Sequence, residues 1–236
     1  MKKFPLGKET FTLGDSGQDY VFTNHGSYGA TPRSVTKFRN DLLLEVERNP
    51  DLWFRETASV KLAKAIQAVS SFVHCHPKDL AFVVNATEAF NTLICSLENE
   101  GLFTATTGVL VLDLAYGAIQ NTLVKLCERT QCDLVEVKVP LPLLSVQAII
   151  RAVEHRLDEY NRRNHGRKIK VAVFDHITSQ TALVLPIKKL VQLCHERNIR
   201  NTSFLSPPFS NRVVLFVCSL LNLYFIVDSE KHSMFH

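Results

Sequence analysis

Residues 108–139, GVLVLDLAYGAIQNTLVKLCERTQCDLVEVKV, place one apolar segment on each side of an amphipathic one. GVLVLD (108–113) and DLVEVKV (133–139) are short and rich in β-branched residues, which is typical of buried strands. GAIQNTLVKLCERT (117–130) has apolar residues at a spacing of three to four and therefore predicts a helix. Two such strands joined through a helix pair in parallel and are covered on both faces. The stretch thus predicts an α/β fold.

The same alternation continues on both sides of this stretch. Upstream, DLAFVVN (79–85) predicts a strand and TEAFNTLICSLEN (87–99) predicts a helix. The remaining predicted elements are helices at 34–49, 57–73, 144–161 and 186–198 and a strand at 168–175. Together they predict a mostly parallel sheet with helices on both faces, in which ligands bind at the carboxyl ends of the strands.

The overall composition is that of an average globular protein. The 236 residues are 46% hydrophobic and 21% charged, which excludes a disordered chain, a collagen and a coiled coil. The formal net charge of +4 comes without a basic stripe, so nucleic acid is not expected as a partner. The opening MKKFPLGKETF has no apolar segment after its lysines and does not predict a secretory signal.

The cysteines predict neither a disulfide scaffold nor a metal site. Six cysteines in this length are too sparse for a scaffold, and no pair has C-x-x-C spacing. His74-Cys75-His76 resembles a metal-binding cluster, but three consecutive residues rarely close a tetrahedral site. Sparse cysteines and the lack of a secretory signal favour a reducing compartment, and we expect the cytoplasm.

The composition changes near residue 200. Residues 201–236 carry four charged side chains, and VVLFVCSLLNLYFIV (213–227) is a run of 15 uncharged residues. A membrane-spanning helix needs about 17–25 apolar residues, and Ser219 and Asn222 weaken the run further. The run favours a buried strand or a pair of strands over a tail anchor. A third interpretation is that the tail does not belong to an evolved domain.

The first strand is followed by Asn85-Ala86-Thr87-Glu88, which has two interpretations. Asn85 is a good N-cap and Glu88 follows three residues later, so the four residues resemble a capping box that starts the helix. Alternatively, small residues at a helix N-terminus offer backbone N–H groups to a phosphate, with the Thr87 hydroxyl as a further donor. In that case Glu88 should point away from the phosphate.

Polar or aromatic residues also follow two later strands. Tyr116-Gly117 stands at a strand-to-helix turn, where the ring either offers a flat face to a planar ligand or merely covers the sheet. Asp175–Thr181 holds six polar or titratable residues in seven, which is more than a turn needs and favours a ligand site. Within it, His176 is either an acid–base group or a solvent-facing side chain.

Five segments occur in a fixed order: NHGSYGATP (24–32), NPDLWFR (49–55), NATEAFNT (85–92), YGAIQNT (116–122) and DHITSQTALVLPI (175–187). In this order they resemble the class V aminotransferase family of pyridoxal-phosphate enzymes. The resemblance is strongest to the isopenicillin-N epimerase-like branch, which is related to cysteine desulfurases. It covers roughly residues 20–199 and implies an incomplete fold type I large domain.

The resemblance implies roles for the matching residues. Ala86 and Thr87 would hold the phosphate of pyridoxal 5′-phosphate, and Tyr116 would stack on its pyridine ring. The segment from Asp175 to Ser179 would line the ring near its phenolic oxygen, although many relatives have asparagine where Ser179 stands. The substrate loop would consist of Asn24, His25, Gly26 and Ser27.

The chain departs from the family after His195–Ile199. Relatives continue into a strand that ends in an aspartate, the partner of the pyridine nitrogen, and later supply the Schiff-base lysine. Here Arg200–Pro208 shows no recognisable strand of that kind, and Lys231, the one lysine after Lys189, lacks the family context. We therefore expect a truncated and catalytically impaired member, with no catalytic residue assigned and weak or absent cofactor binding.

This expectation divides the chain into an N-terminal arm (1–56), a partial cofactor-binding domain (57–199) and a divergent hydrophobic tail (200–236). The family reaction would be epimerisation, desulfuration or transamination of an amino acid, so an amino-acid-like molecule is the expected small partner. The alternatives are a non-catalytic fragment that pairs with a full-length relative, and a tail-anchored or misfolded fragment. A homodimer or such a heterodimer is expected, and a membrane is not.

Overall fold

The computed structural model describes residues 10–13, 21–23, 28–142, 145–163, 166–204, 213–218 and 224–228. These residues form two compact units, one before His74 and one from His74 onward. The substrate loop predicted at Asn24–Ser27 lies outside the described residues.

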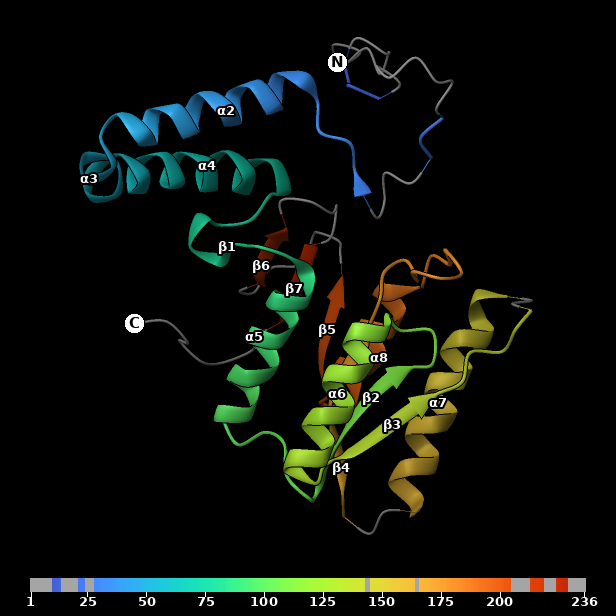
Figure 1. The fold of residues 1–236 in the computed structure, drawn as a ribbon. Coiled ribbons are helices and arrows are strands. Elements are labelled where there is room, and N and C mark those ends of the chain that lie inside the picture. Colours follow the sequence, from blue (N-terminus) through green and yellow to red (C-terminus); the bar gives the residue numbers. More distant parts are fainter. Residues whose placement is uncertain are drawn as a thin grey trace. The chain divides into compact units, whose positions relative to one another are not determined.

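The first unit is a pair of long helices, α2 (Arg33–Arg48) and α4 (Ala58–Val73), which lie side by side in both ribbon views (Figure 1). A short helix, α3 (Pro50–Leu52), and a π-helical turn, η1 (Trp53–Thr57), connect them. Asn49 starts this connection, because its side-chain oxygen accepts a hydrogen bond from the Leu52 N–H at 3.1 Å. Both long helices were predicted from the sequence and are confirmed to within one residue at each end.

The second unit is a seven-stranded sheet with helices on both faces. Its strands are β1 (Leu80–Val83), β2 (Thr107–Leu112), β3 (Asp133–Val137), β4 (Lys168–Phe174), β5 (Arg200–Phe204), β6 (Val213–Cys218) and β7 (Tyr224–Asp228). Its helices are the 3-10 turn η2 (Pro77–Asp79), α5 (Ala86–Asn99), α6 (Gly117–Thr130), α7 (Val146–Arg163) and α8 (Ile187–Glu196).

The strand order is β1-β6-β7-β5-β4-β2-β3. Every neighbouring pair is parallel except the two that involve β7, which is antiparallel to both β6 and β5. All strands other than β7 therefore run in one direction. The predicted mostly parallel sheet is confirmed.

The residues after 199 join this sheet. β5 pairs in parallel with β4, so a strand does exist where the sequence showed no recognisable one, but it ends at Phe204 and contains no aspartate. The uncharged run holds β6 and β7, which pair with each other between β1 and β5. The interpretation as a pair of strands is confirmed, and the tail-anchor interpretation is wrong for these two segments. No helix in the described parts of the chain is long and apolar enough to cross a membrane.

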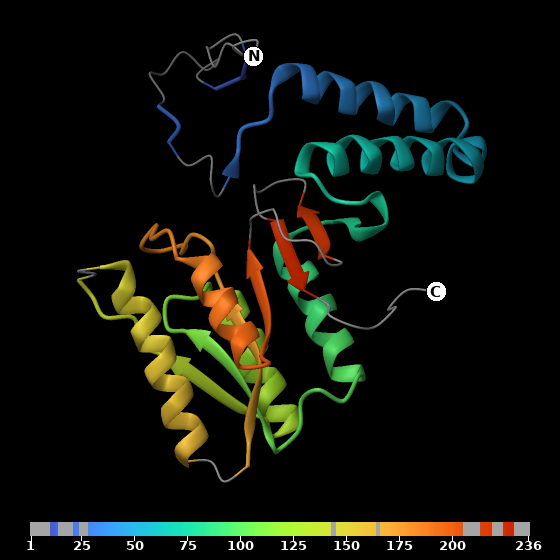
Figure 2. The ribbon, with the colours of Figure 1, turned by 180° about the vertical axis from the view of Figure 1, so that it is seen from behind.

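Side chains alternate between the two faces of the sheet, as a strand period of two requires. On β2, Val109 and Val111 pack in the cluster with α5 and α6, whereas Leu110 and Leu112 pack in the cluster with α7 and α8. Helices α5 and α6 lie in front of the sheet in Figure 1, and α7 and α8 lie in front of it in Figure 2. Two cores therefore hold a central strand that is buried along its whole length.

Leu123 on α6 tests whether this packing stabilises the fold. Its side chain is fully buried, so Leu123→Ala should lower the free energy of unfolding by about 2–5 kcal/mol, through lost burial and the cavity left behind. The neighbouring Val124 is 39% exposed, and Val124→Ala should change that free energy by about 0.5 kcal/mol. Urea denaturation measures both, and equal effects would contradict the described core.

Candidate active site

The candidate ligand groups gather at one edge of the second unit. Strands β1, β2 and β4 run in the same direction, so their carboxyl ends lie at the same edge of the sheet. Helix α5 starts after β1, α6 starts after β2, and the loop from Asp175 follows β4. In open α/β sheets this edge is where ligands bind.

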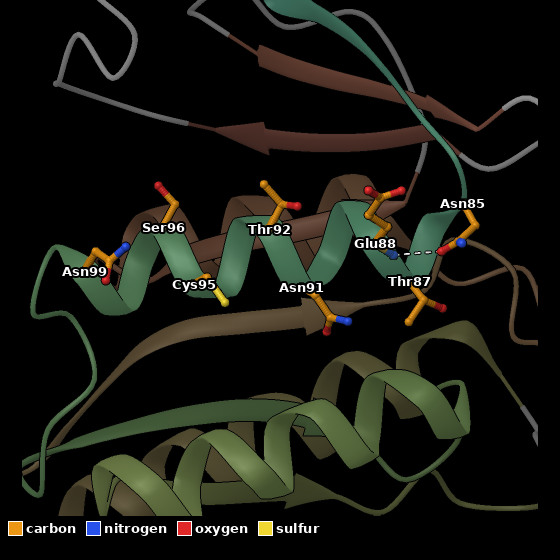
Figure 3. A pocket seen from close by; sticks show the side chains of 8 residues that line it. All are labelled: Asn85, Thr87, Glu88, Asn91, Thr92, Cys95, Ser96 and Asn99. Atoms are coloured by element: carbon orange, nitrogen blue, oxygen red, sulfur yellow. Dashed lines mark hydrogen bonds between the residues drawn. The ribbon is translucent and has the colours of Figure 1, made fainter.

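The start of α5 is built as the capping interpretation predicted. The Asn85 side-chain oxygen accepts a hydrogen bond from the Glu88 N–H at 2.8 Å, and Glu88 Oε2 accepts one from the Val84 N–H at 3.0 Å. This reciprocal arrangement is close to a capping box, with Val84 in place of the N-cap amide. Figure 3 shows the Glu88 and Thr87 side chains projecting to opposite sides of the helix. The acidic group thus points away from Thr87.

An open hollow of about 790 Å³ extends from this helix start along α5. Its lining residues are polar side chains and one thiol: Asn85, Thr87, Glu88, Asn91, Thr92, Cys95, Ser96 and Asn99 (Figure 3). Asn91 is held by the Thr122 hydroxyl of α6, which donates to its Oδ1 at 2.9 Å. Because all lining residues belong to one helix and its cap, the hollow is a polar surface rather than an enclosed cavity.

Tyr116 forms the turn that starts α6. Its carbonyl oxygen accepts hydrogen bonds from the N–H groups of Ile119 and Gln120, at 2.8 and 3.1 Å. The Gln120 side chain donates to the carbonyl oxygen of Asp113 at 3.0 Å and so fixes the same turn. The Tyr116 side chain itself is 52% exposed. The backbone is therefore fixed while part of the ring stays open to solvent.

Among the acidic residues whose side chains the structure describes, Asp175 is the one that is buried. It follows directly on β4, and its Oδ2 has no hydrogen-bond partner among the described residues. Burial raises the pKa of this carboxyl to about 6, and a hydrogen bond from the Tyr116 backbone N–H partly offsets the rise. Asp175 thus lies beside Tyr116 with one oxygen free to accept a further donor.

The loop after Asp175 is ordered by Thr178. This buried residue accepts a hydrogen bond from the Leu183 N–H at 2.9 Å, and its hydroxyl lies 2.7 Å from that of Thr181. Ser179 is exposed on the same loop. His176 has a buried Nδ1 without a partner among the described residues, so it is not simply a solvent-facing side chain.

The predicted site residues therefore fall into three groups. Tyr116 and Asp175 lie together, whereas Ala86 and Thr87 begin α5 and Ser179 lies on the loop beyond Asp175. The roles assigned to these residues stay predictions. Asp113 was not selected as a site residue from the sequence, although it ends a predicted strand as Asp175 does. Its Oδ1 accepts a hydrogen bond from the Val139 N–H at 3.0 Å.

The described residues contain no cluster of three or more potential metal ligands. Part of the His74-Cys75-His76 segment has a structural role instead. The Nδ1 atom of His76 accepts a hydrogen bond from the Lys78 N–H at 3.1 Å and so caps the 3-10 turn η2.

Residues 35–201 match the family model of the class-V aminotransferases. The chain belongs to this family. The match covers more than half of the chain and runs from the first turn of α2 through α4 and the sheet to the start of β5. Members of this family are pyridoxal-phosphate enzymes, as the resemblance implied.

Two plant proteins are similar to this chain over about three quarters of its length. One is a probable chloroplastic L-cysteine desulfhydrase of Arabidopsis thaliana, 27% identical over 77% of this chain and 38% of the relative. The other is a putative L-cysteine desulfhydrase 1 of Oryza sativa subsp. japonica, 31% identical over 75% of this chain and 37% of the relative. The chain therefore spans less than two fifths of the length of each.

A solved structure shows the same fold at low sequence identity. It is a mutant of C-DES with glycine covalently linked to its PLP cofactor, and it covers 84% of this chain and 49% of its own. The TM-score is 0.66 at 15% identity, so the likeness concerns the fold alone. The predicted fold type I architecture is confirmed, and the isopenicillin-N epimerase-like branch stays a prediction.

Asp175 gives the site a pH dependence that can be measured. The pKa of this carboxyl is about 6 in the folded chain and 3.8 ordinarily, so between these pH values the folded state retains a proton that the unfolded state has released. Ionisation therefore lowers the free energy of unfolding as the pH rises from about 4 to 7, by roughly 3 kcal/mol at most.

Urea denaturation of the wild type and Asp175→Asn across this pH range isolates the effect. We expect the wild type to lose stability relative to the variant as the pH rises, because only the wild type has to bury a charge. If the free energies of unfolding of the two proteins change with pH in parallel, burial does not oppose the ionisation of Asp175 in the folded state.

Proposed function

We propose that this chain binds pyridoxal 5′-phosphate at the carboxyl edge of its sheet and supplies the cofactor-binding part of an enzyme that acts on a sulfur-containing amino acid. The observation that carries the proposal is the buried Oδ2 of Asp175 beside Tyr116, which has no hydrogen-bond partner among the described residues, in a chain of the class-V aminotransferase family. A buried acceptor without a donor is costly, and a ligand donor at this place would satisfy it.

The start of α5 suits the phosphate group. A 14-residue helix presents N–H groups and the positive end of its dipole at its N-terminus, and both favour an anion. Ala86 is small and Thr87 adds a hydroxyl donor beside these amides. The one acidic residue of this turn, Glu88, is turned to the opposite side and engaged with the Val84 N–H.

Three side chains could contact the pyridine ring of the cofactor: those of Tyr116, Asp175 and Ser179. The half-exposed face of Tyr116 is available for stacking on a planar ligand, and Asp175 Oδ2 accepts a hydrogen bond from a polar hydrogen of that ligand. The exposed Ser179 hydroxyl offers a further polar contact, as the resemblance implies near the phenolic oxygen. When bound, pyridoxal phosphate supplies the electron sink for bond breaking at an amino acid.

The relatives suggest which amino acid is involved. Both plant proteins carry the name L-cysteine desulfhydrase, and we extend L-cysteine to this chain as the proposed substrate class. The loop at Asn24–Ser27 is the proposed substrate contact, because the family resemblance implies that this segment faces the substrate.

The chain also lacks recognisable groups that the family reaction needs. Strand β5 contains no aspartate to pair with the pyridine nitrogen, and Lys231 is the one lysine after Lys189. We therefore propose that residues 1–236 alone hold the cofactor without a covalent bond to lysine and show little turnover. Pairing with a full-length relative would then give the chain its role.

Calorimetric titration of the purified chain with pyridoxal 5′-phosphate tests the binding proposal. Thr87→Val should weaken binding roughly tenfold or more, because it removes a hydroxyl donor to an anion. Tyr116→Ala should weaken it roughly 2- to 10-fold through lost stacking. Thr92→Val is the matched control, since Thr92 lines the same hollow but projects to the other side of α5, and it should bind as the wild type does.

Borohydride reduction followed by mass analysis tests the second part of the proposal. We expect no covalent cofactor adduct on any lysine of the chain. An adduct on one lysine would contradict the proposal that the chain holds the cofactor without a covalent bond to lysine, and it would identify a catalytic residue. A wild type that fails to bind the cofactor would contradict the proposed site.

A further inference from the structure

Two cysteine thiols meet at the end of the sheet opposite to the candidate site. Cys127 lies in the last turn of α6, and Cys132 lies directly before β3. Their Sγ atoms are 3.2 Å apart and share a hydrogen bond. Among the cysteines whose side chains the structure describes, they are the one pair joined in this way.

The backbone between the two cysteines holds them at this distance. Gln131 has a φ of 60°, in the left-handed region, and its N–H donates to the Cys127 carbonyl oxygen at 2.9 Å. This turn ends α6 and brings Cys132 back over the last helical turn. The Thr130 hydroxyl donates to the Leu126 carbonyl at 2.8 Å and accepts from the Cys132 N–H at 3.4 Å, which fixes the turn further.

The surroundings of the two sulfur atoms differ. Cys132 is buried in the core cluster beneath α5 and α6, whereas Cys127 is half-buried at the margin of the same cluster. The hydrogen bond from Cys127 lowers the pKa of the Cys132 thiol, and the same contact, with burial, raises the pKa of Cys127. Two thiols therefore lie within contact distance of each other, which is the geometry that oxidation to a disulfide requires.

We propose that Cys127 and Cys132 are an oxidation site at which a peroxide forms a reversible disulfide between α6 and β3. The Cys132 sulfur attacks one oxygen of hydrogen peroxide, the O–O bond breaks, and the other oxygen leaves as water after protonation. The Cys127 sulfur then attacks the resulting sulfenic acid, and a second water leaves with the Cys127 proton. Two thiols and one peroxide thus give one disulfide and two waters.

The distance change that the disulfide requires is small. A disulfide has an S–S length of about 2.05 Å, so the sulfur atoms must approach by roughly 1.1 Å, which side-chain rotation supplies. The pair lies at the end of α6 away from Tyr116, at the amino edge of the parallel strands. The two thiols therefore lie at the opposite edge of the sheet from the proposed cofactor site.

Peptide mapping of the full chain after treatment with hydrogen peroxide tests the proposal. Trypsin cleaves after Lys125, Arg129 and Lys138, so the disulfide should join the peptides LCER (126–129) and TQCDLVEVK (130–138). The intact chain should lose about 2 Da by release of two hydrogens. Dithiothreitol should separate the peptides and restore the mass.

Three variants complete the test. Cys127→Ser and Cys132→Ser should each abolish the linked peptide, and Cys95→Ser, which changes an exposed cysteine, should leave it unchanged. Over-oxidation of Cys132 to a sulfinic acid in the wild type, a different cysteine pairing, or two thiols that stay alkylatable after peroxide would each overturn the proposal. The wild-type map decides the question even where a variant fails to fold.

Discussion

The common direction of β1, β2 and β4 is the constraint on which the candidate site depends. These strands are far apart in the sequence, yet each delivers its following turn to the same edge of the sheet. The direction of β2 to β5 follows from their connections, because each of these strands is reached through one of the helices α5 to α8. Two buried cores, one on each face, hold β2 and β4 in place and thereby hold Tyr116 and Asp175 beside each other.

Much of this arrangement could be predicted from the sequence because it is local. The apolar runs at 79–85, 108–113 and 168–175 each hold a strand, and the spacing at 87–99 and 117–130 gives helices that match to within one residue. The spacing of apolar residues that indicates a helix or a strand is set by residues close together in the sequence, so these predictions needed no knowledge of packing. The N-cap of α5 is equally local, since Asn85 and Glu88 are three residues apart.

The remaining features depend on contacts between distant parts of the chain. The polar run at 175–181 indicated a site, but the burial of Asp175 against other elements, which raises its pKa and leaves Oδ2 without a partner in the described part of the chain, could not be predicted from it. The uncharged run at 213–227 predicted strands, but not their places between β1 and β5, because pairing partners are not encoded locally. The contact between Cys127 and Cys132 spans only five residues, but it requires the left-handed turn at Gln131, which the spacing of apolar residues does not reveal.

A crystal structure of the chain grown with pyridoxal 5′-phosphate would show whether the carboxyl edge of this sheet holds the cofactor. We expect phosphate density at the amino end of α5 beside Thr87, with the ring against Tyr116 and a polar atom within hydrogen-bond distance of Asp175 Oδ2. Cofactor density elsewhere on the chain, or an Asp175 carboxyl whose free oxygen is satisfied by protein alone while the cofactor is bound, would contradict this expectation.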